Sequence, residues 1–174
     1  MAKSLVHDDL PYRPCVGIAL FNNAGKVWFG KRLWNGTPEH EEPNHLWQWP
    51  QGGIDKGEAP LDAAYRELFE ETNVKSVGLL KEATNWFNYD LQKERLGIAL
   101  KGKYRGQTQK WFAFRFDGDD SEINVLSPGN GKHKAEFSTW RWGELSAGPD
   151  LVVPFKREVY LQVVTEFREF SQQI

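Results

Sequence analysis

Three glutamates, Glu67, Glu70 and Glu71, are the residues whose type and spacing suggest chemistry most directly. On a helix, spacings of three and four place their carboxylates on one face, where like charges repel by roughly 0.2–0.5 kcal/mol per pair. The acids also lie near the expected C-terminal end of that helix, where the helix dipole disfavours negative charge. A solvated, glutamate-rich surface tolerates this cost, whereas a bound cation would offset it.

Carboxylate oxygens without histidine or cysteine suit hard divalent cations, so we expect Mg²⁺ (or Mn²⁺) as the cofactor. Mg²⁺ usually completes its shell with water and substrate phosphates, which indicates a phosphorylated substrate. The four histidines, His7, His40, His45 and His133, show no zinc spacing, and the single Cys15 permits no internal disulfide. Together these features favour a reducing, cytoplasmic location.

A glycine-rich segment over residues 52–57 precedes the acidic helix and, taken alone, could be an ordinary turn. Joined to Glu58 and to the run from Arg66 to Glu71, it resembles the Nudix box. That pattern is glycine, five residues, glutamate, seven residues, Arg-Glu, an aliphatic residue, any residue, Glu-Glu, any residue, glycine and an aliphatic residue. The matching residues are Gly52, Glu58, Arg66, Glu67, Leu68, Glu70, Glu71 and Val74. Asn73 replaces the second glycine, and asparagine tolerates the left-handed conformation well.

The resemblance implies a Nudix-type α/β/α sandwich that hydrolyses a nucleoside diphosphate linked to another moiety. It implies that Glu67, Glu70 and Glu71 hold divalent ions, that Glu58 is a weaker ligand or a support for the loop, and that Arg66 pairs with an acidic neighbour. Such cations neutralise the phosphate oxygens and lower the pKa of a bound water that attacks phosphorus.

The resemblance extends from Tyr12 to the terminal helix. Over this range the chain is similar to the bacterial RNA pyrophosphohydrolase group, which overlaps with the dinucleoside polyphosphate hydrolases. It rests on residues 46–53, 106–112, 135–137, 140–142 and 153–160. The expected substrates are therefore 5′-triphosphorylated RNA, which loses pyrophosphate, or Ap4A, which yields ATP and AMP. The alternative is a non-catalytic nucleotide or RNA sensor. A sensor could lose the acidic residues, whereas this chain has them.

The same resemblance makes Glu136 a further metal ligand or general base, with a rim carboxylate as the alternative. Either Glu71 or Glu136 could serve as the base. The candidates for binding the substrate are Arg32, Gly52, Gly53, Tyr89, Lys103 and Lys110. Tyr89 could stack on a base or simply fill the core. Lys132, His133 and Lys134 could guide the polyphosphate or form a solvated loop.

Apolar patterns define the elements that must position these residues. Strands are expected over 15–21, 26–32, 46–50, 74–80, 83–91, 108–116 and 137–142, with one helix from Pro60 to about Thr72 and a terminal one on the stripe Phe155, Val159, Val163 and Phe167. In the strand over 108–116, Phe112, Phe114 and Phe116 should face one side and Trp111, Ala113 and Arg115 the other. This order predicts an α/β or α+β sandwich with a mixed sheet and two main helices.

With 174 residues, the chain is expected to form one domain, over 1–174. The formal net charge of −2 argues against wholesale capture of nucleic acid, so we expect no DNA partner. No apolar run is long enough for a signal peptide or a membrane span, and the oligomeric state is not predicted. The polar stretch from Leu33 to His45 is a predicted surface loop that could cover the substrate.

Overall fold

The computed structural model describes residues 9–33 and 45–172. Its strands are β1 (Tyr12–Phe21), β2 (Val27–Arg32), β3 (Trp47–Gln48), β4 (Gln51–Gly53), β5 (Val77–Glu82), β6 (Phe87–Asp90), β7 (Gly106–Phe116) and β8 (Phe137–Gly143). Its helices are α1 (Pro60–Thr72), the short α2 (Gly148–Leu151) and α3 (Arg157–Phe167). Residues 34–44 of the predicted polar loop lie outside the described residues, so its covering role stays a prediction.

The strands form one mixed sheet with the order β3-β2-β1-β7-β5, in which β4 pairs with β1, β6 with β7 and β8 with β2. The long central strands β1 and β7 run parallel, from Tyr12 opposite Gly106 to Phe21 opposite Arg115. All other pairs are antiparallel. The predicted mixed sheet is confirmed, and it is an α+β arrangement.

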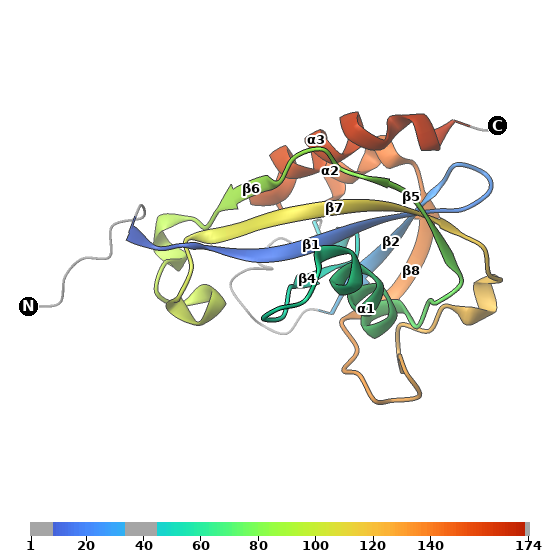
Figure 1. Cartoon of the computed structure of the whole chain (residues 1–174), viewed down its shortest axis with the longest axis horizontal. Coiled ribbons are helices and arrows are strands. Elements are labelled where there is room, and N and C mark those ends of the chain that lie inside the picture. Colours follow the sequence, from blue (N-terminus) through green and yellow to red (C-terminus); the bar gives the residue numbers. More distant parts are fainter. Residues whose placement is uncertain (1–8, 34–44, 173–174) are drawn as a thin grey trace, which may run out of the picture.

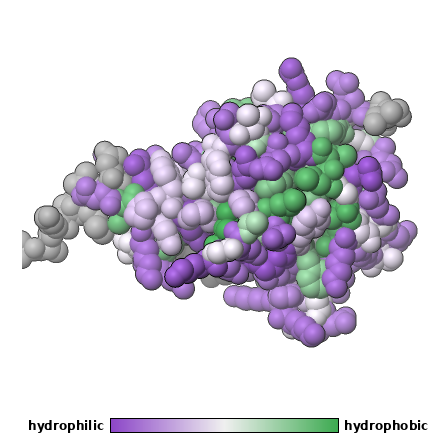
Figure 2. All heavy atoms as spheres, in the orientation of Figure 1, coloured by the Kyte–Doolittle hydropathy of each residue, from purple (hydrophilic) through white to green (hydrophobic). Residues whose placement is uncertain are grey.

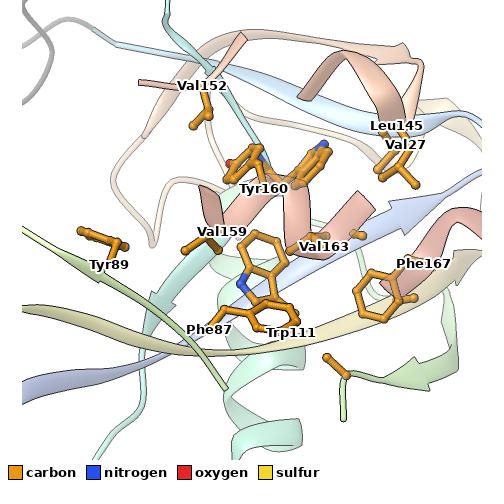
Figure 3. Close-up of a cluster of buried hydrophobic side chains, with 14 of the residues drawn as sticks. Val27, Phe87, Tyr89, Trp111, Leu145, Val152, Val159, Tyr160, Val163 and Phe167 are labelled. Atoms are coloured by element: carbon orange, nitrogen blue, oxygen red, sulfur yellow. The ribbon is translucent and has the colours of Figure 1, made fainter. Parts of the chain in front are cut away.

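Two cores lie on opposite faces of this sheet, because the side chains of β7 alternate between them. Phe112, Phe114 and Phe116 pack in the core that includes Ala64 and Leu68 of α1. Trp111 and Ala113 pack in the other core, with the buried residues of α3. Helices α1 and α3 thus cover different faces (Figure 1). Figure 3 shows Tyr160 and Val163 of α3 beside Trp111 of β7. The predicted faces of the strand are confirmed.

Helix α1 begins and ends where the sequence predicts. Pro60 is in its first turn, where the missing N–H has no intrahelical partner to lose. Asn73 ends the helix in the left-handed conformation with φ 69°, and its N–H donates to the carbonyl of Phe69 at 2.8 Å. The Asn73 side chain also donates to the carbonyl of Glu122 and accepts from the N–H of Gly129. An asparagine here therefore does what a glycine could not, since it holds two later loops against the helix.

Other strand boundaries differ from the predictions. Strand β5 begins at Val77 rather than Val74, and carries an irregularity between Leu79 and Lys81. Only Phe87–Asp90 of the predicted strand over 83–91 is a strand, because the chain turns between two segments that both pair with β7. The predicted loop over 92–106 contains a turn of 3₁₀ helix, Lys93–Arg95, and a tight turn, Ala99–Gly102, in which Leu100 and Lys101 adopt the left-handed conformation.

Hydrophilic side chains cover most of the face seen in Figure 2, and hydrophobic ones gather in its right half. Among the helices of residues 9–33 and 45–172, none has the length and apolar character needed to cross a membrane.

Candidate active site

Two cavities meet at the end of α1. The larger, of about 300 Å³, is lined by Arg13, Arg32, Gln51, Gly52, Gly53, Glu67, Glu71, Tyr89, Leu91, Leu100, Gln107, Glu136, Val153, Phe155 and Lys156. The smaller, of about 210 Å³, is lined by Glu67, Glu70, Glu71, His133, Lys134 and Glu136. Glu67, Glu71 and Glu136 line both cavities. The structure thus gathers four of the predicted acidic residues around one place.

Glu71 is the most buried of these acids, with 8% of its surface exposed. Its Oε2 accepts a hydrogen bond from the backbone N–H of Gln51 at 3.1 Å. Burial, followed by the negative charge of Glu67, raises the pKa of Glu71 well above its ordinary value. Glu71 is buried because it lies three residues after the core residue Leu68, on the flank of α1 that β4 covers.

Burial also raises the pKa of Glu67, although the neighbouring Arg66 opposes the shift. A Cβ atom built on Gly52 would overlap the Glu67 carboxylate, and one on Gly53 would overlap the guanidinium of Arg13. Both glycines of β4 are therefore needed for the close approach of the strand to these side chains, and both line the larger cavity.

Arg66 organises the opposite side of the acidic cluster. Its guanidinium donates to both oxygens of Glu58 at 2.8 and 2.9 Å, to Glu67 at 2.8 Å and to the carbonyl of Gly53 at 2.8 Å. A weaker contact reaches Glu70 at 3.4 Å. These bonds raise the pKa of Arg66 and fix it as a cation that ties the glycine loop to the helix.

Glu58 lies outside the lining of both cavities. Besides the Arg66 bonds, it accepts the N–H of Asp55 at 2.9 Å, and the Arg66 hydrogen bonds lower the pKa of Glu58 to about 2. Of the two roles predicted for Glu58, this position favours support of the loop over metal binding.

Basic side chains from three parts of the chain line the larger cavity: Arg13 of β1, Arg32 of β2 and Lys156 just before α3. The Nη2 of Arg32 lies 3.9 Å from Oε2 of Glu136. Its Nε is buried and has no hydrogen-bond partner among the described residues. An arginine with a spare buried donor beside a cavity is suited to an anionic ligand.

Tyr89 lines the larger cavity and is also packed, with 8% of its surface exposed. Its ring centroid lies 5.3 Å from that of Phe155, and the Nζ of Lys156 is 5.9 Å from the centroid of each ring. The two alternatives for Tyr89, core and site, are therefore compatible.

Two predicted lysines lie apart from both cavities. Lys110 donates to the carbonyl of Ala83 at 2.6 Å and pairs with Glu82 at 3.3 Å, so its charge is used at the edge of the sheet. Lys103 is exposed, directly after the turn Ala99–Gly102. The structure does not bring either lysine to the acidic cluster.

The acidic cluster fits a hard divalent cation in its chemistry, because Glu67, Glu70, Glu71 and Glu136 offer only oxygen ligands around one cavity. Among the residues that the structure describes, no three acidic, histidine or cysteine side chains already converge with the spacing of a metal site. Arg66 explains this in part, since it draws Glu67 and Glu70 toward itself. A bound cation would compete with Arg66 for these oxygens.

Arg13, Gln51, Gln107, Phe155 and Lys156 line the larger cavity, but sequence reasoning did not select them. They come from strand ends and the entry to α3, where local spacing carries no information about the site. Lys156 did offer one indication. It lies three residues before Val159 of the predicted apolar stripe, so it falls on the face that the stripe buries, where lysines are rare.

The comparisons with known proteins agree with this geometry. Residues 11–163 match the model of the NUDIX domain. The chain is 59% identical to an RNA pyrophosphohydrolase of Azorhizobium caulinodans over 94% of this chain and 96% of that protein. It is 58% identical to one of Brucella anthropi over 92% of each.

Solved structures show the same fold at low identity. The dihydroneopterin triphosphate pyrophosphohydrolase of E. coli is 17% identical, with a TM-score of 0.62 over 89% of this chain and 98% of that one. An Ap4A hydrolase of C. elegans is 18% identical, with a TM-score of 0.57 over 90% and 98%. The fold, the match over most of the chain and the glycine-to-glutamate motif together show that this chain belongs to the Nudix family.

Proposed function

We propose that this chain is an RNA pyrophosphohydrolase, which removes pyrophosphate from the 5′-triphosphate end of RNA in a metal-dependent hydrolysis. The observation that carries the proposal is the acidic set shared by two cavities, Glu67, Glu71 and Glu136, one of which also holds Arg13, Arg32 and Lys156. Cleavage of a phosphoric anhydride requires carboxylates that bind metal ions, next to basic side chains that bind the phosphates.

Glu67, Glu70, Glu71 and Glu136 would hold the divalent ion, which we propose to be Mg²⁺ (or Mn²⁺). When bound, it would neutralise phosphate charge and lower the pKa of a nearby water. Arg66 holds Glu67 and the glycine loop in place. Of the shared acids, Glu71 and Glu136 have no arginine within hydrogen-bond distance in the part of the chain that the structure describes, so either could accept the proton of the attacking water.

Arg32 and Lys156 would bind phosphates, and Tyr89 with Phe155 would contact a base. Aromatic stacking contributes about 1–3 kcal/mol per base and tolerates different bases, which suits an enzyme acting on many RNA ends. Gly52 and Gly53 would let the backbone approach the substrate. The lysines Lys103 and Lys110 have no part in this arrangement.

RNA is the preferred substrate class because relatives at 58–59% identity carry the name RNA pyrophosphohydrolase. The Ap4A hydrolase structure, at 18% identity, supports the fold alone. We place the reaction in the cytoplasm, where nascent RNA carries its triphosphate.

The test is a parallel assay of 5′-triphosphorylated RNA and Ap4A with Mg²⁺, scored for pyrophosphate in one case and for ATP plus AMP in the other. We expect pyrophosphate release to be the faster reaction, and to stop when the metal is chelated. Exclusive cleavage of Ap4A would overturn the RNA assignment. Tight binding of RNA without any turnover would instead support the sensor.

A further inference from the structure

The smaller cavity differs from the larger one in what lines it. Among the described residues, its lining has four glutamates, Glu67, Glu70, Glu71 and Glu136, and two basic residues, His133 and Lys134. Its volume of about 210 Å³ corresponds to roughly seven waters. This charged lining suits a small phosphate anion that is bound together with metal cations better than an apolar nucleobase.

Lys134 is placed to meet such an anion. Its side chain is exposed and has no hydrogen bond or ion pair with any residue of the described ranges, although four carboxylates line the same cavity. Lys110, by contrast, is already paired with Glu82. The ammonium group of Lys134 is therefore available to a ligand.

The segment that carries Lys134 is held against the end of α1. The N–H of Gly129 donates to Asn73 at 3.0 Å, and the ring of His133 packs edge-on against Phe69 with centroids 5.8 Å apart. At its far end, the carbonyl of Glu136 accepts the N–H of Leu33 at 3.0 Å. His133 acts as an anchor, so the position of Lys134 relative to the glutamates is defined.

We propose that the smaller cavity receives the departing pyrophosphate and that Lys134 binds its distal phosphate. The nucleotide would lie in the larger cavity, and the polyphosphate would cross the shared carboxylates, Glu67, Glu71 and Glu136, with their cations. This inference rests on the proposed function.

The reaction balances without any further reactant. One water is consumed, the anhydride bond between the α- and β-phosphates breaks, and 5′-monophosphorylated RNA, pyrophosphate and a proton are formed. The bound cations and Lys134 together would neutralise the charge of the pyrophosphate as it separates.

The test compares two substrates that differ only at the leaving end: RNA with a 5′-triphosphate, which releases pyrophosphate, and RNA with a 5′-diphosphate, which releases orthophosphate. For Lys134→Ala we expect kcat/KM on the triphosphate to fall roughly 10- to 100-fold, with a much smaller loss on the diphosphate. Inhibition by added pyrophosphate should weaken by a similar factor, and Lys134→Arg should recover most of the activity.

Lys132→Ala is the matched control, because Lys132 is an exposed lysine of the same segment that does not line the cavity. Lys132→Ala should change neither the ratio of kcat/KM on the two substrates nor the inhibition by added pyrophosphate. Equal losses of Lys134→Ala on both substrates, or equal effects of Lys132→Ala and Lys134→Ala, would overturn the inference and leave the proposed function standing. Failure of the unmodified protein to release pyrophosphate would instead overturn the proposed function, and the inference with it.

Discussion

The two sides of helix α1 handle negative charge in opposite ways. On the side of the glycine loop, Glu58 is bound by Arg66 through two hydrogen bonds and its pKa is low. On the side of the cavities, Glu71 is buried beside Glu67, no basic group of residues 9–33 and 45–172 lies at hydrogen-bond distance from it, and its pKa is raised. The paired side stabilises the loop, and the unpaired side is costly to the folded protein until a cation binds. The comparison separates residues that hold the loop in place from residues that we propose to bind the cation.

Glu71→Gln should give the largest effect. It removes a carboxylate from the proposed cation site, so kcat/KM on triphosphorylated RNA should fall by roughly 10²–10³-fold. The metal-free protein should be as stable as the unmodified one or more so, because a desolvated charge is removed. Steady-state kinetics and thermal unfolding in chelator measure the two effects.

The sign of the pH dependence makes this prediction sharper. A carboxyl group whose pKa is raised on folding contributes stability at low pH, which is lost as the pH rises through that raised value. The stability gain of Glu71→Gln in chelator should therefore grow as the pH rises above the ordinary carboxyl pKa of 4.5. A variant that is less stable than the unmodified protein at pH 8 without metal would contradict this account of Glu71.

Arg66→Ala tests the paired side. It removes the guanidinium donors of Glu58, Glu67 and the carbonyl of Gly53, so we expect about 1–3 kcal/mol of destabilisation. Activity should fall roughly 10- to 100-fold through misplacement of the loop. Arg66→Lys should recover little, because an ammonium group cannot reproduce the bidentate bonds. Denaturant unfolding measures the loss of stability, and steady-state kinetics measures the loss of activity. Full recovery of both in Arg66→Lys would show that the positive charge alone is enough to hold the loop.

Tyr89→Ala probes a residue that lines the larger cavity but belongs to neither group of charges. Its effect should be on KM for RNA, with a rise of roughly 5- to 100-fold, and not on kcat. Tyr89→Phe is the control, since it keeps the ring that packs on Phe155. A fall in kcat with unchanged KM would place Tyr89 with the catalytic residues instead.

The sequence was sufficient for the parts of the site that are close together in the chain. Gly52, Glu58, Arg66 and the three glutamates lie within one loop and one helix, so their spacing determines their geometry. The ends of α1 were predictable for the same reason, because Pro60 and Asn73 act through local backbone conformation.

The parts that depend on distant strands were not predictable. Arg13 reaches the site through the parallel pairing of β1 with β7, and Lys156 through the packing of α3 on the sheet. Lys110 was selected from its place in an aromatic strand, yet Ala83 and Glu82 of the neighbouring strand region take up its charge. Glu71 shows the same limit, since its spacing predicts its face on the helix but not the strand β4 that buries it.

Glu58→Gln should give the smallest effect and completes the comparison. Glutamine keeps the size of the side chain but loses the charge that Arg66 binds, so at pH 7 the melting temperature should fall by about 2–4 °C. A carboxyl group whose pKa is lowered on folding contributes stability above its ordinary value, and this stability is lost as the pH falls through the lowered one. The difference from the unmodified protein should thus shrink from about pH 4.5 toward about pH 2, opposite in sign to that of Glu71→Gln. Thermal unfolding of both variants in one pH series checks this, and parallel pH profiles would mean that the two sides of α1 do not differ as described.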